Sequence, residues 1–150
     1  ETGIRSSDRL VQVSLADIPV MGGPEMKFPI FVDHSKIPVV LSKVSPINIY
    51  AISLGLFVFC RDVLSDRGKQ HETIHYLQWR ELAFVVFLIL YPLFWLILMI
   101  RWRDGGKAYM LIPFECEAYL HEKEKGYLEN RKWFSWWKYM GALKGVDYYA

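Results

Sequence analysis

Two histidines and a glutamate stand at a spacing that could bind and use a metal ion. His71 and His75 are four positions apart, and Glu72 follows the first histidine, giving the pattern HExxH. On a helix, residues four apart share one face, so both imidazoles could bind one metal while Glu72 acts as general base. Zinc accepts such ligands in tetrahedral geometry and lowers the pKa of a bound water towards about 7. The pattern predicts a zinc-dependent hydrolase.

The alternative interpretation of this segment is a helix that carries two exposed histidines and no metal. It is less favoured, because the chain has 4 histidines and two of them flank a glutamate at ligand spacing. His34 and His121 have no partners at such a spacing. Cys116 is better explained as a buried structural cysteine than as a thiolate ligand. The remaining ligand is therefore sought among carboxylates.

The segment FECEAY offers two candidates for a third ligand. Glu115 and Glu117 both stand near the start of a later predicted helix. Residues two apart on a helix point roughly 200° apart, so only one of them can face the metal. Helical geometry alone leaves the choice between them open.

These two segments together resemble the gluzincins, metallopeptidases whose metal is held by two histidines and a glutamate. In that family the glutamate often opens an ExxAD motif, and the segment ECEAY is similar to it, with Tyr119 in place of the aspartate. The resemblance implies that Glu115 is the third ligand and that Glu72 is the general base. In the family the aspartate usually supports a ligand histidine. The resemblance therefore implies that Tyr119 is one of the catalytic residues and supports a histidine through its hydroxyl.

A longer part of the chain, residues 47–140, resembles small uncharacterised bacterial membrane-associated proteins. The shared motifs are HExxHxxQ, FExEAY and FSWxKY, which here read HETIHYLQ, FECEAY and FSWWKY. This resemblance implies a zincin-like site and no particular substrate. Gln78, the last residue of the first motif, either supports the site or is a surface glutamine, and both alternatives stay open.

The elements before the HExxH motif are predicted to be β-strands. Residues 28–32 and 37–41 are short β-type runs around a polar turn and predict a hairpin. Residues 47–62 are rich in β-branched and aromatic side chains, which predicts a strand or a strand pair bent at Gly55. Residues 11–20 alternate weakly. We expect an α+β fold that begins with an antiparallel β-hairpin or meander.

The elements that carry the candidate ligands are predicted to be helices. Ser65 offers a helix cap, and from residue 69 to residue 104 Pro92 is the single helix breaker, so a long HExxH helix should continue into an apolar segment. Residues 114–130 predict a helix that returns Glu115 to the metal, and residues 131–140 predict a further short helix. The chain is short enough for one domain, which we place at residues 11–150, with residues 1–10 a tag remnant or a disordered N-terminus.

Residues 83–100 are 18 consecutive apolar or aromatic residues, which is enough to cross a membrane. A straight span of about 30 Å would leave the histidines and Glu115 on opposite sides, where they could not share a metal. A break at Pro92 would resolve this conflict, because the two arms could then dip into one leaflet, with Arg80, Arg101 and Arg103 at the interface. We expect a membrane-associated protein of bacterial type, monotopic or integral, on an undetermined side of the membrane.

Composition narrows the classes of function. The net charge of +2 lacks the basic excess of nucleic-acid binders, and 53% of residues are hydrophobic. The expected partners are membrane lipid and an unidentified peptide or protein substrate, with homo-oligomer formation left open and no nucleic acid. The predicted function is a zinc-dependent metallopeptidase acting at a membrane surface. The alternative is a non-catalytic membrane protein with a structural or vestigial zinc site.

Overall fold

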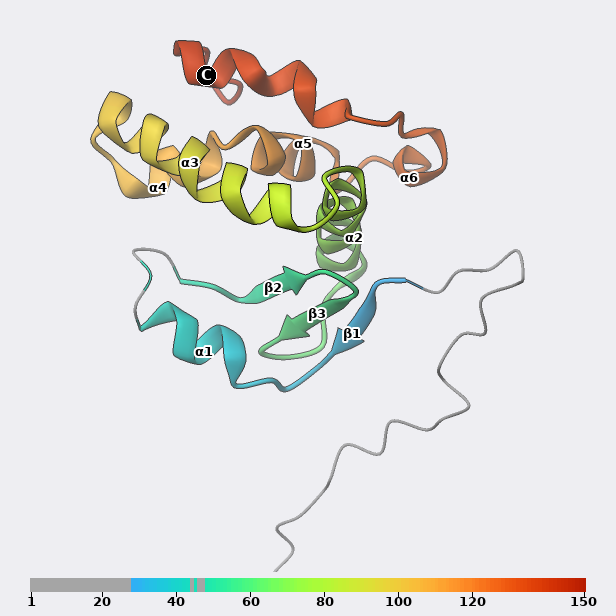
Figure 1. Cartoon of the computed structure of the whole chain (residues 1–150). Helices are drawn as coiled ribbons and strands as arrows, with labels where there is room; N and C mark the ends of the chain where they lie inside the picture. Colours follow the sequence, from blue (N-terminus) through green and yellow to red (C-terminus); the bar gives the residue numbers. More distant parts are fainter. Residues whose placement is uncertain (1–27, 44, 46–47) are drawn as a thin grey trace, which may run out of the picture.

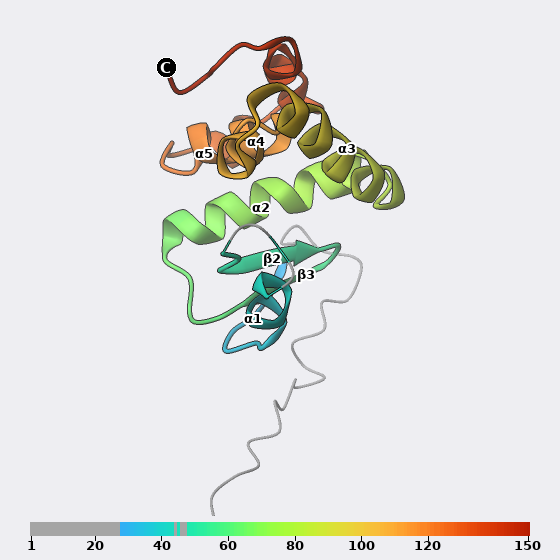
Figure 2. The same ribbon diagram turned by 90° about the vertical axis from the view of Figure 1, so that its left-hand side faces the viewer.

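The computed structural model describes residues 28–43, 45 and 48–150, and the predictions for residues 1–10 and 11–20 lie outside them. The elements are, in chain order, β1 (Ile30–Val32), α1 (Ile37–Ser42), β2 (Ala51–Leu54), β3 (Phe57–Cys60), α2 (Asp66–Glu81), α3 (Val85–Trp102), α4 (Gly105–Met110), α5 (Pro113–His121), α6 (Tyr127–Asn130) and the 3-10 helix η2 (Ser135–Lys144). The predicted α+β class is confirmed. Both views show α2 between the small sheet with α1 on one side and the helices that follow α2 on the other (Figures 1 and 2).

The three-stranded sheet has the order β1-β3-β2. Strands β2 and β3 form an antiparallel hairpin, and β1 pairs with β3 in parallel. The predicted bend at Gly55 is confirmed, since this glycine has a φ of 67° in the turn between β2 and β3. In the described part of the chain β2 is therefore an edge strand, and α2 packs against it.

The predicted hairpin between residues 28–32 and 37–41 is wrong. The first run contains β1, but the second forms helix α1. Pro38 lies in the first turn of this helix, where its missing N–H leaves no bond unmade. The Ser35 hydroxyl accepts a hydrogen bond from the Ile37 N–H at the same end. In a paired strand Pro38 would have no N–H to donate to the neighbouring strand. The proline therefore decides between the helix and the predicted hairpin.

Helix α2 begins as predicted and ends earlier than predicted. The Ser65 side chain caps its start by accepting from the Gly68 N–H. The chain reverses after Glu81, and Ala83 and Phe84 take left-handed φ angles of 48° and 59°. No glycine or proline marks this reversal in the sequence.

Aromatic packing explains the reversal between α2 and α3. The ring of Phe87 stacks on Trp79 of α2 and on Phe114 of α5, with centroid distances of 4.6 Å and 4.7 Å. A continuous helix would carry Phe87 away from both rings. The two residues with left-handed φ angles cost about 1–2 kcal/mol each. Burial of these large side chains stabilises the fold by more than this cost.

The predicted break of the apolar helix at Pro92 is wrong, because α3 runs through this residue. A proline removes one helical hydrogen bond. Phe94 and Leu98, which follow Pro92, nevertheless pack into the core with the rest of the helix. Among the described residues, α3 is the helix long and apolar enough to cross a membrane, and only 17% of it is buried.

Two further helices return the chain along α3 to the HExxH motif. Asp104 caps α4 by accepting from the Lys107 N–H at 2.9 Å, and α4 packs against α3. α5 then packs against α2 and brings Glu115 to the middle of α3, where the Tyr91 hydroxyl donates to it at 2.6 Å. The helix predicted for residues 114–130 is two helices, α5 and α6, and the predicted C-terminal helix is present as η2.

Candidate metal centre

The structure brings His71, His75 and Glu115 into one buried group that could hold a metal ion. The two histidines lie one turn apart on α2, and Glu115 reaches them from the first turn of α5. The imidazole Nε2 atoms are 3.1 Å apart. His75 Nε2 is 3.2 Å from Glu115 Oε1, and His71 Nε2 is 3.5 Å from Glu115 Oε2. All three side chains face the same small volume.

These distances fit a tetrahedral metal ion. Ligand atoms at about 2.1 Å from such an ion lie about 3.4 Å from one another. The two Nε2 atoms, and each Nε2 atom with its nearer Glu115 oxygen, are at similar separations, and one ligand atom from each of the three residues lies within 4.8 Å of the others. Glu115 Oε2 has no hydrogen-bond partner within the described ranges, although it is buried. A buried carboxylate oxygen of this kind is costly unless a cation or a donor approaches it.

The orientation of both histidines leaves their Nε2 atoms free for a metal. His71 Nδ1 lies 3.1 Å from Glu122 Oε2, and Arg67 holds the other oxygen of Glu122 through an ion pair. A carboxylate accepts, so the proton of neutral His71 must be on Nδ1 and the lone pair on Nε2. This is the arrangement that supports metal-binding histidines in many proteins.

His75 is oriented in the same way by a glutamine. Its Nδ1 lies 2.8 Å from Gln78 Oε1. The Gln78 amide nitrogen donates to the Phe114 carbonyl and to Glu117 Oε2, at 3.1 Å and 3.0 Å, which fixes the amide with its oxygen towards His75. Of the two interpretations of Gln78, the structure supports the one in which it holds the site, because its side chain is fully buried.

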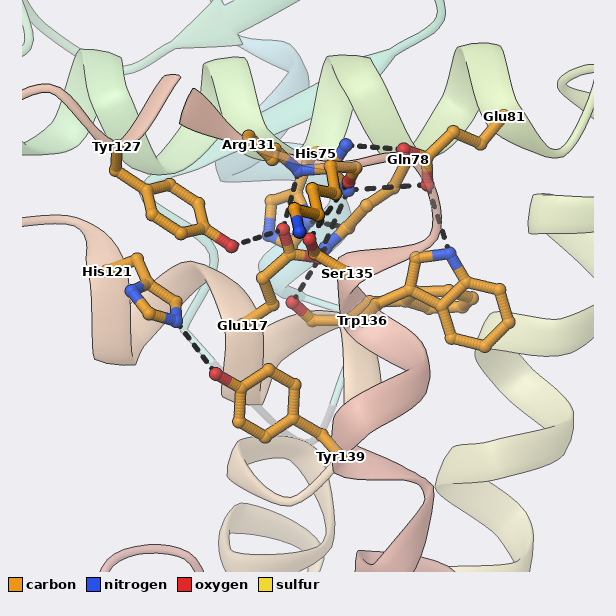
Figure 3. A network of polar contacts seen from close by, with 12 residues as sticks. His75, Gln78, Glu81, Glu117, His121, Tyr127, Arg131, Ser135, Trp136 and Tyr139 are labelled. Atoms are coloured by element: carbon orange, nitrogen blue, oxygen red, sulfur yellow. Dashed lines mark hydrogen bonds and ion pairs between the residues drawn. The ribbon is translucent and has the colours of Figure 1, made fainter. Parts of the chain in front are cut away.

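Glu117 points away from the metal group and into a second buried network (Figure 3). Arg131 binds Glu117 through Nε at 2.5 Å and also pairs with Glu81 at the end of α2. The Tyr127 hydroxyl donates to Glu117 at 2.8 Å, and the Trp136 indole N–H donates to Glu81 at 3.1 Å. The choice left open by helical geometry is thus settled by placement: Glu115 faces the histidines, and Glu117 anchors the C-terminal segment to α2.

The charges of the histidines and carboxylates in the metal group depend on one another. Burial lowers the pKa of His71, but its contacts with the carboxylates of Glu115 and Glu122 outweigh burial and raise the pKa to about 10. Burial would raise the pKa of Glu115, and the two histidines lower it below its ordinary value. Protons on the histidines thus balance the buried carboxylates, and a bound metal ion would take the place of these protons.

Glu72 lies beside the three candidate ligands and is 7% exposed. Its Oε2 atom is buried and makes no hydrogen bond with any residue that the structure describes. Burial raises the pKa of this carboxyl, while the two neighbouring histidines lower it. Of the acidic side chains in the described chain, Glu72 is the one that lines both of the cavities adjoining the group.

Three tyrosines surround the group. The ring of Tyr119 packs edge-on against His71 with a centroid distance of 4.6 Å, so Tyr119 contacts this histidine through its ring and not through its hydroxyl. The carboxylate that supports His71 is instead Glu122, one turn further along the chain. Tyr91 donates to Glu115, and Tyr109 faces Tyr119 in a T-shaped contact. The sequence reasoning missed Glu122. It lies seven residues after Glu115, a spacing that puts two helical residues on one face, and this spacing could have identified it.

Two cavities adjoin the group. One, of about 390 Å³, is lined mainly by apolar side chains of β2, α2 and α3 and also by His71, Glu72, His75 and Glu115. The other, of about 590 Å³, has a mixed lining in which Arg67 and Glu122 lie beside apolar side chains such as Val63 and Leu64, and it is also lined by His71, Glu72 and Tyr119. All three candidate ligands therefore border the smaller cavity, and His71 borders both.

Comparison of the chain with protein-family models, with curated proteins and with solved structures finds no match in any of the three. The resemblance to gluzincins and to the bacterial membrane-associated proteins therefore stays a prediction. What the site can do has to be argued from its own geometry.

Proposed function

We propose that the chain is a zinc-dependent metallopeptidase that acts at a membrane surface. The observation that carries the proposal is the mutual spacing of His71 Nε2, His75 Nε2 and the Glu115 carboxylate, together with a buried Glu72 oxygen, Oε2, that has no hydrogen-bond partner among the described residues. Two imidazoles and one carboxylate are ligands that zinc binds in catalytic sites, which keep a fourth position open. The two adjoining cavities supply room for that position.

The roles of the side chains follow from their placement. Zinc in this group would polarise a peptide carbonyl and acidify a water molecule. Glu72 takes the proton of the attacking water and passes it to the leaving amine, so that the C–N bond breaks and a carboxylate and an amine are formed. Tyr109, which lines both cavities, is the phenol available to donate to the carbonyl oxygen as it gains charge.

The edge strand β2 supports a peptide as the substrate. Ala51, Ile52, Ser53 and Leu54 all line the apolar cavity. An edge strand presents unpaired backbone groups, and an extended peptide can pair with them as an added strand. A peptide held in this way would pass beside the candidate ligands.

The outer face of α3 supports the membrane location. Its exposed apolar residues, which we call the α3 face, are Val85, Val86, Leu88, Ile89, Leu93, Leu96, Ile97 and Ile100. A patch of this kind on one side of a helix is typical of helices that lie in a membrane interface. Arg101 and Arg103 at the end of the helix and the exposed Trp133 and Trp137 are residue types favoured at the headgroup level.

Metal content and hydrolysis test this proposal together. We expect one zinc per chain in the purified protein and its loss in His71→Ala. Glu72→Gln should keep the zinc and lose hydrolysis of a quenched-fluorescence peptide library by about 100-fold or more. Zinc binding without any hydrolysis in the wild type would favour a structural zinc site, and a metal-free protein would contradict both.

A further inference from the structure

The two cavities beside the metal group differ in chemistry, because the charged side chains of Arg67 and Glu122 line the larger one and not the smaller one, although both reach His71 and Glu72. The smaller cavity, the apolar arm, is lined by side chains that include Ile52, Leu54, Trp79, Phe87, Leu88 and Pro92. The larger cavity, the polar arm, contains the polar and charged side chains Asn48, Ser65, Arg67 and Glu122 beside apolar ones such as Val63 and Leu64. A chain segment that passes the metal group therefore meets a mainly apolar wall on one side and a wall that carries an ion pair on the other.

From this division we infer that the substrate is a peptide whose residues are apolar on one side of the cleaved bond and polar on the other. Such a peptide is found where a membrane-inserted segment meets water. The inference rests on the proposed peptidase function and adds the class of substrate to it.

Leu88 connects the apolar arm to the α3 face. This residue lines the apolar arm and is also 56% exposed on the outside of α3. Pro92, one turn later, lines the same arm. If α3 lies in the membrane interface, an apolar segment can pass from the lipid into the arm without losing its apolar surroundings, which avoids the cost of exposing it to water.

The polar arm opens where charged groups meet solvent. The Arg67 side chain is about half exposed and pairs with Glu122, which in turn holds His71. A polar half of the substrate can keep its hydration or exchange it for these groups, whereas an apolar half would have to remove water from an ion pair. This arm therefore selects against a second apolar segment.

Strand β2 links the two arms into one path. Tyr50 and Ala51 line the polar arm, and Ala51 to Leu54 line the apolar arm. A peptide added to the edge of β2 would cross the boundary beside Ala51, near the residues shared by both cavities. The boundary in the substrate's polarity then falls close to the metal group.

Binding to an inactive variant tests the inference without relying on catalysis. Zinc-loaded Glu72→Gln is titrated against three dye-labelled decapeptides in the absence of membranes: one half leucine-rich and half polar, one polar throughout, and one leucine-rich throughout. We expect fluorescence anisotropy to give a Kd for the mixed peptide about tenfold or more below that of either other peptide. Equal affinities would overturn the inference.

A matched pair of substitutions locates the apolar half. In the same membrane-free assay Leu88→Asp should weaken binding of the mixed peptide about tenfold, because the charge lies in the apolar arm. Ile89→Asp is the control, since Ile89 is 60% exposed on the same helix and does not line this cavity. If both substitutions have the same effect, the apolar arm does not hold the peptide.

The outcomes separate this inference from the peptidase proposal. Selective binding by Glu72→Gln without cleavage by the wild type would keep the substrate class and reject the peptidase. Cleavage by the wild type without preference for the mixed peptide, in the same three-peptide set, would keep the peptidase and reject the substrate class.

Discussion

Two supporting side chains determine how the histidines present themselves. His71 is held by Glu122 and His75 by Gln78, each through Nδ1. Both Nε2 atoms therefore face the same point, and at 3.1 Å from each other they either share a proton or, when both imidazoles are neutral, direct two lone pairs to a common cation. Metal affinity should depend on these supports nearly as much as on the ligands.

Glu122→Gln tests the support of His71. The amide can still accept one hydrogen bond, but it removes the negative charge that makes the imidazole a stronger ligand. We expect zinc affinity, measured by competition with a chromophoric chelator, to fall about 10-fold to 100-fold. The control is Glu124→Gln, because Glu124 contacts His121 and makes no contact with the two ligand histidines in the described structure. An unchanged affinity in Glu122→Gln would show that Glu122 does not support the site.

The Arg131 guanidinium is the cation of the second buried network. Contacts with Glu81 and Glu117 raise its pKa above the ordinary value although burial lowers it. Arg131→Met leaves two buried carboxylates without their cation, and we expect the free energy of unfolding in urea to fall by about 3–5 kcal/mol. Lys132→Met, at the exposed neighbouring position, should change it by less than about 0.5 kcal/mol. A loss in Arg131→Met no larger than that of the control would mean that the network is not formed in solution.

Cys60 offers a test of burial in the sheet. Burial raises the pKa of this thiol from 9.0 to about 12. At pH 8 the thiolate fraction falls from about one in ten to about one in ten thousand, so alkylation by iodoacetamide, followed by mass spectrometry, should be about 1000-fold slower than in urea. Because the folded state binds this proton more tightly, the thiol's contribution to stability is present below about pH 9 and is lost as the pH rises towards 12. Rapid alkylation at pH 8 without denaturant would contradict the buried position of β3.

The reversal between α2 and α3 is the decisive feature among the helices and strands. It places α3 back over the HExxH helix and allows α4 and α5 to deliver Glu115. The backbone of Ala83 has a φ of 48°, which costs an L-residue energy that glycine does not pay.

Ala83→Gly should therefore stabilise the protein. We expect a gain of about 0.5–1 kcal/mol in the free energy of unfolding, because glycine adopts the left-handed region without a Cβ clash. Ala118→Gly is the control, since Ala118 lies in a right-handed helix, and there glycine should cost about 1 kcal/mol. A loss of stability in Ala83→Gly would mean that α2 and α3 are continuous in solution.

The sequence was sufficient for the parts of the site that lie close together along the chain. HExxH on a capped helix predicted where His71 and His75 would lie, and the bend at Gly55 predicted the β2–β3 hairpin. The position of the chain reversal was not predictable from local signals, because Ala83 and Phe84 have no turn-forming character. Contacts of Phe87 with rings distant in sequence decide it, and local propensity does not contain such contacts.

At the scale of the whole molecule, the apolar α3 face lies beside a cavity that reaches the buried metal group. Leu88 joins the two, since it is exposed on α3 and lines this cavity together with His75. The predicted conflict between a membrane helix and a shared metal is removed, because α4 and α5 form the return path as helices with satisfied backbone groups. A helix lying in the interface keeps Glu115 and the histidines on one side of the membrane.

Binding to vesicles tests this arrangement. The double substitution Leu93→Glu and Ile100→Glu adds charge to the α3 face at positions that do not line the cavities described above. We expect its partition into anionic lipid vesicles, measured by flotation, to fall about tenfold or more. Val40→Glu is the control, because Val40 is 58% exposed on α1, beyond the sheet (Figure 1). Equal partition of all three proteins would place the membrane contact elsewhere.

The Glu81–Arg131 pair also bears on when the metal group can be completed during synthesis. Its partners are 50 residues apart, and Trp136 joins them from still further along the chain. A nascent helix α2 carries both histidines long before the ribosome has released Arg131. Zinc captured at that early stage would be held by two ligands on an unsupported helix, so full retention of the ion must await the C-terminal segment.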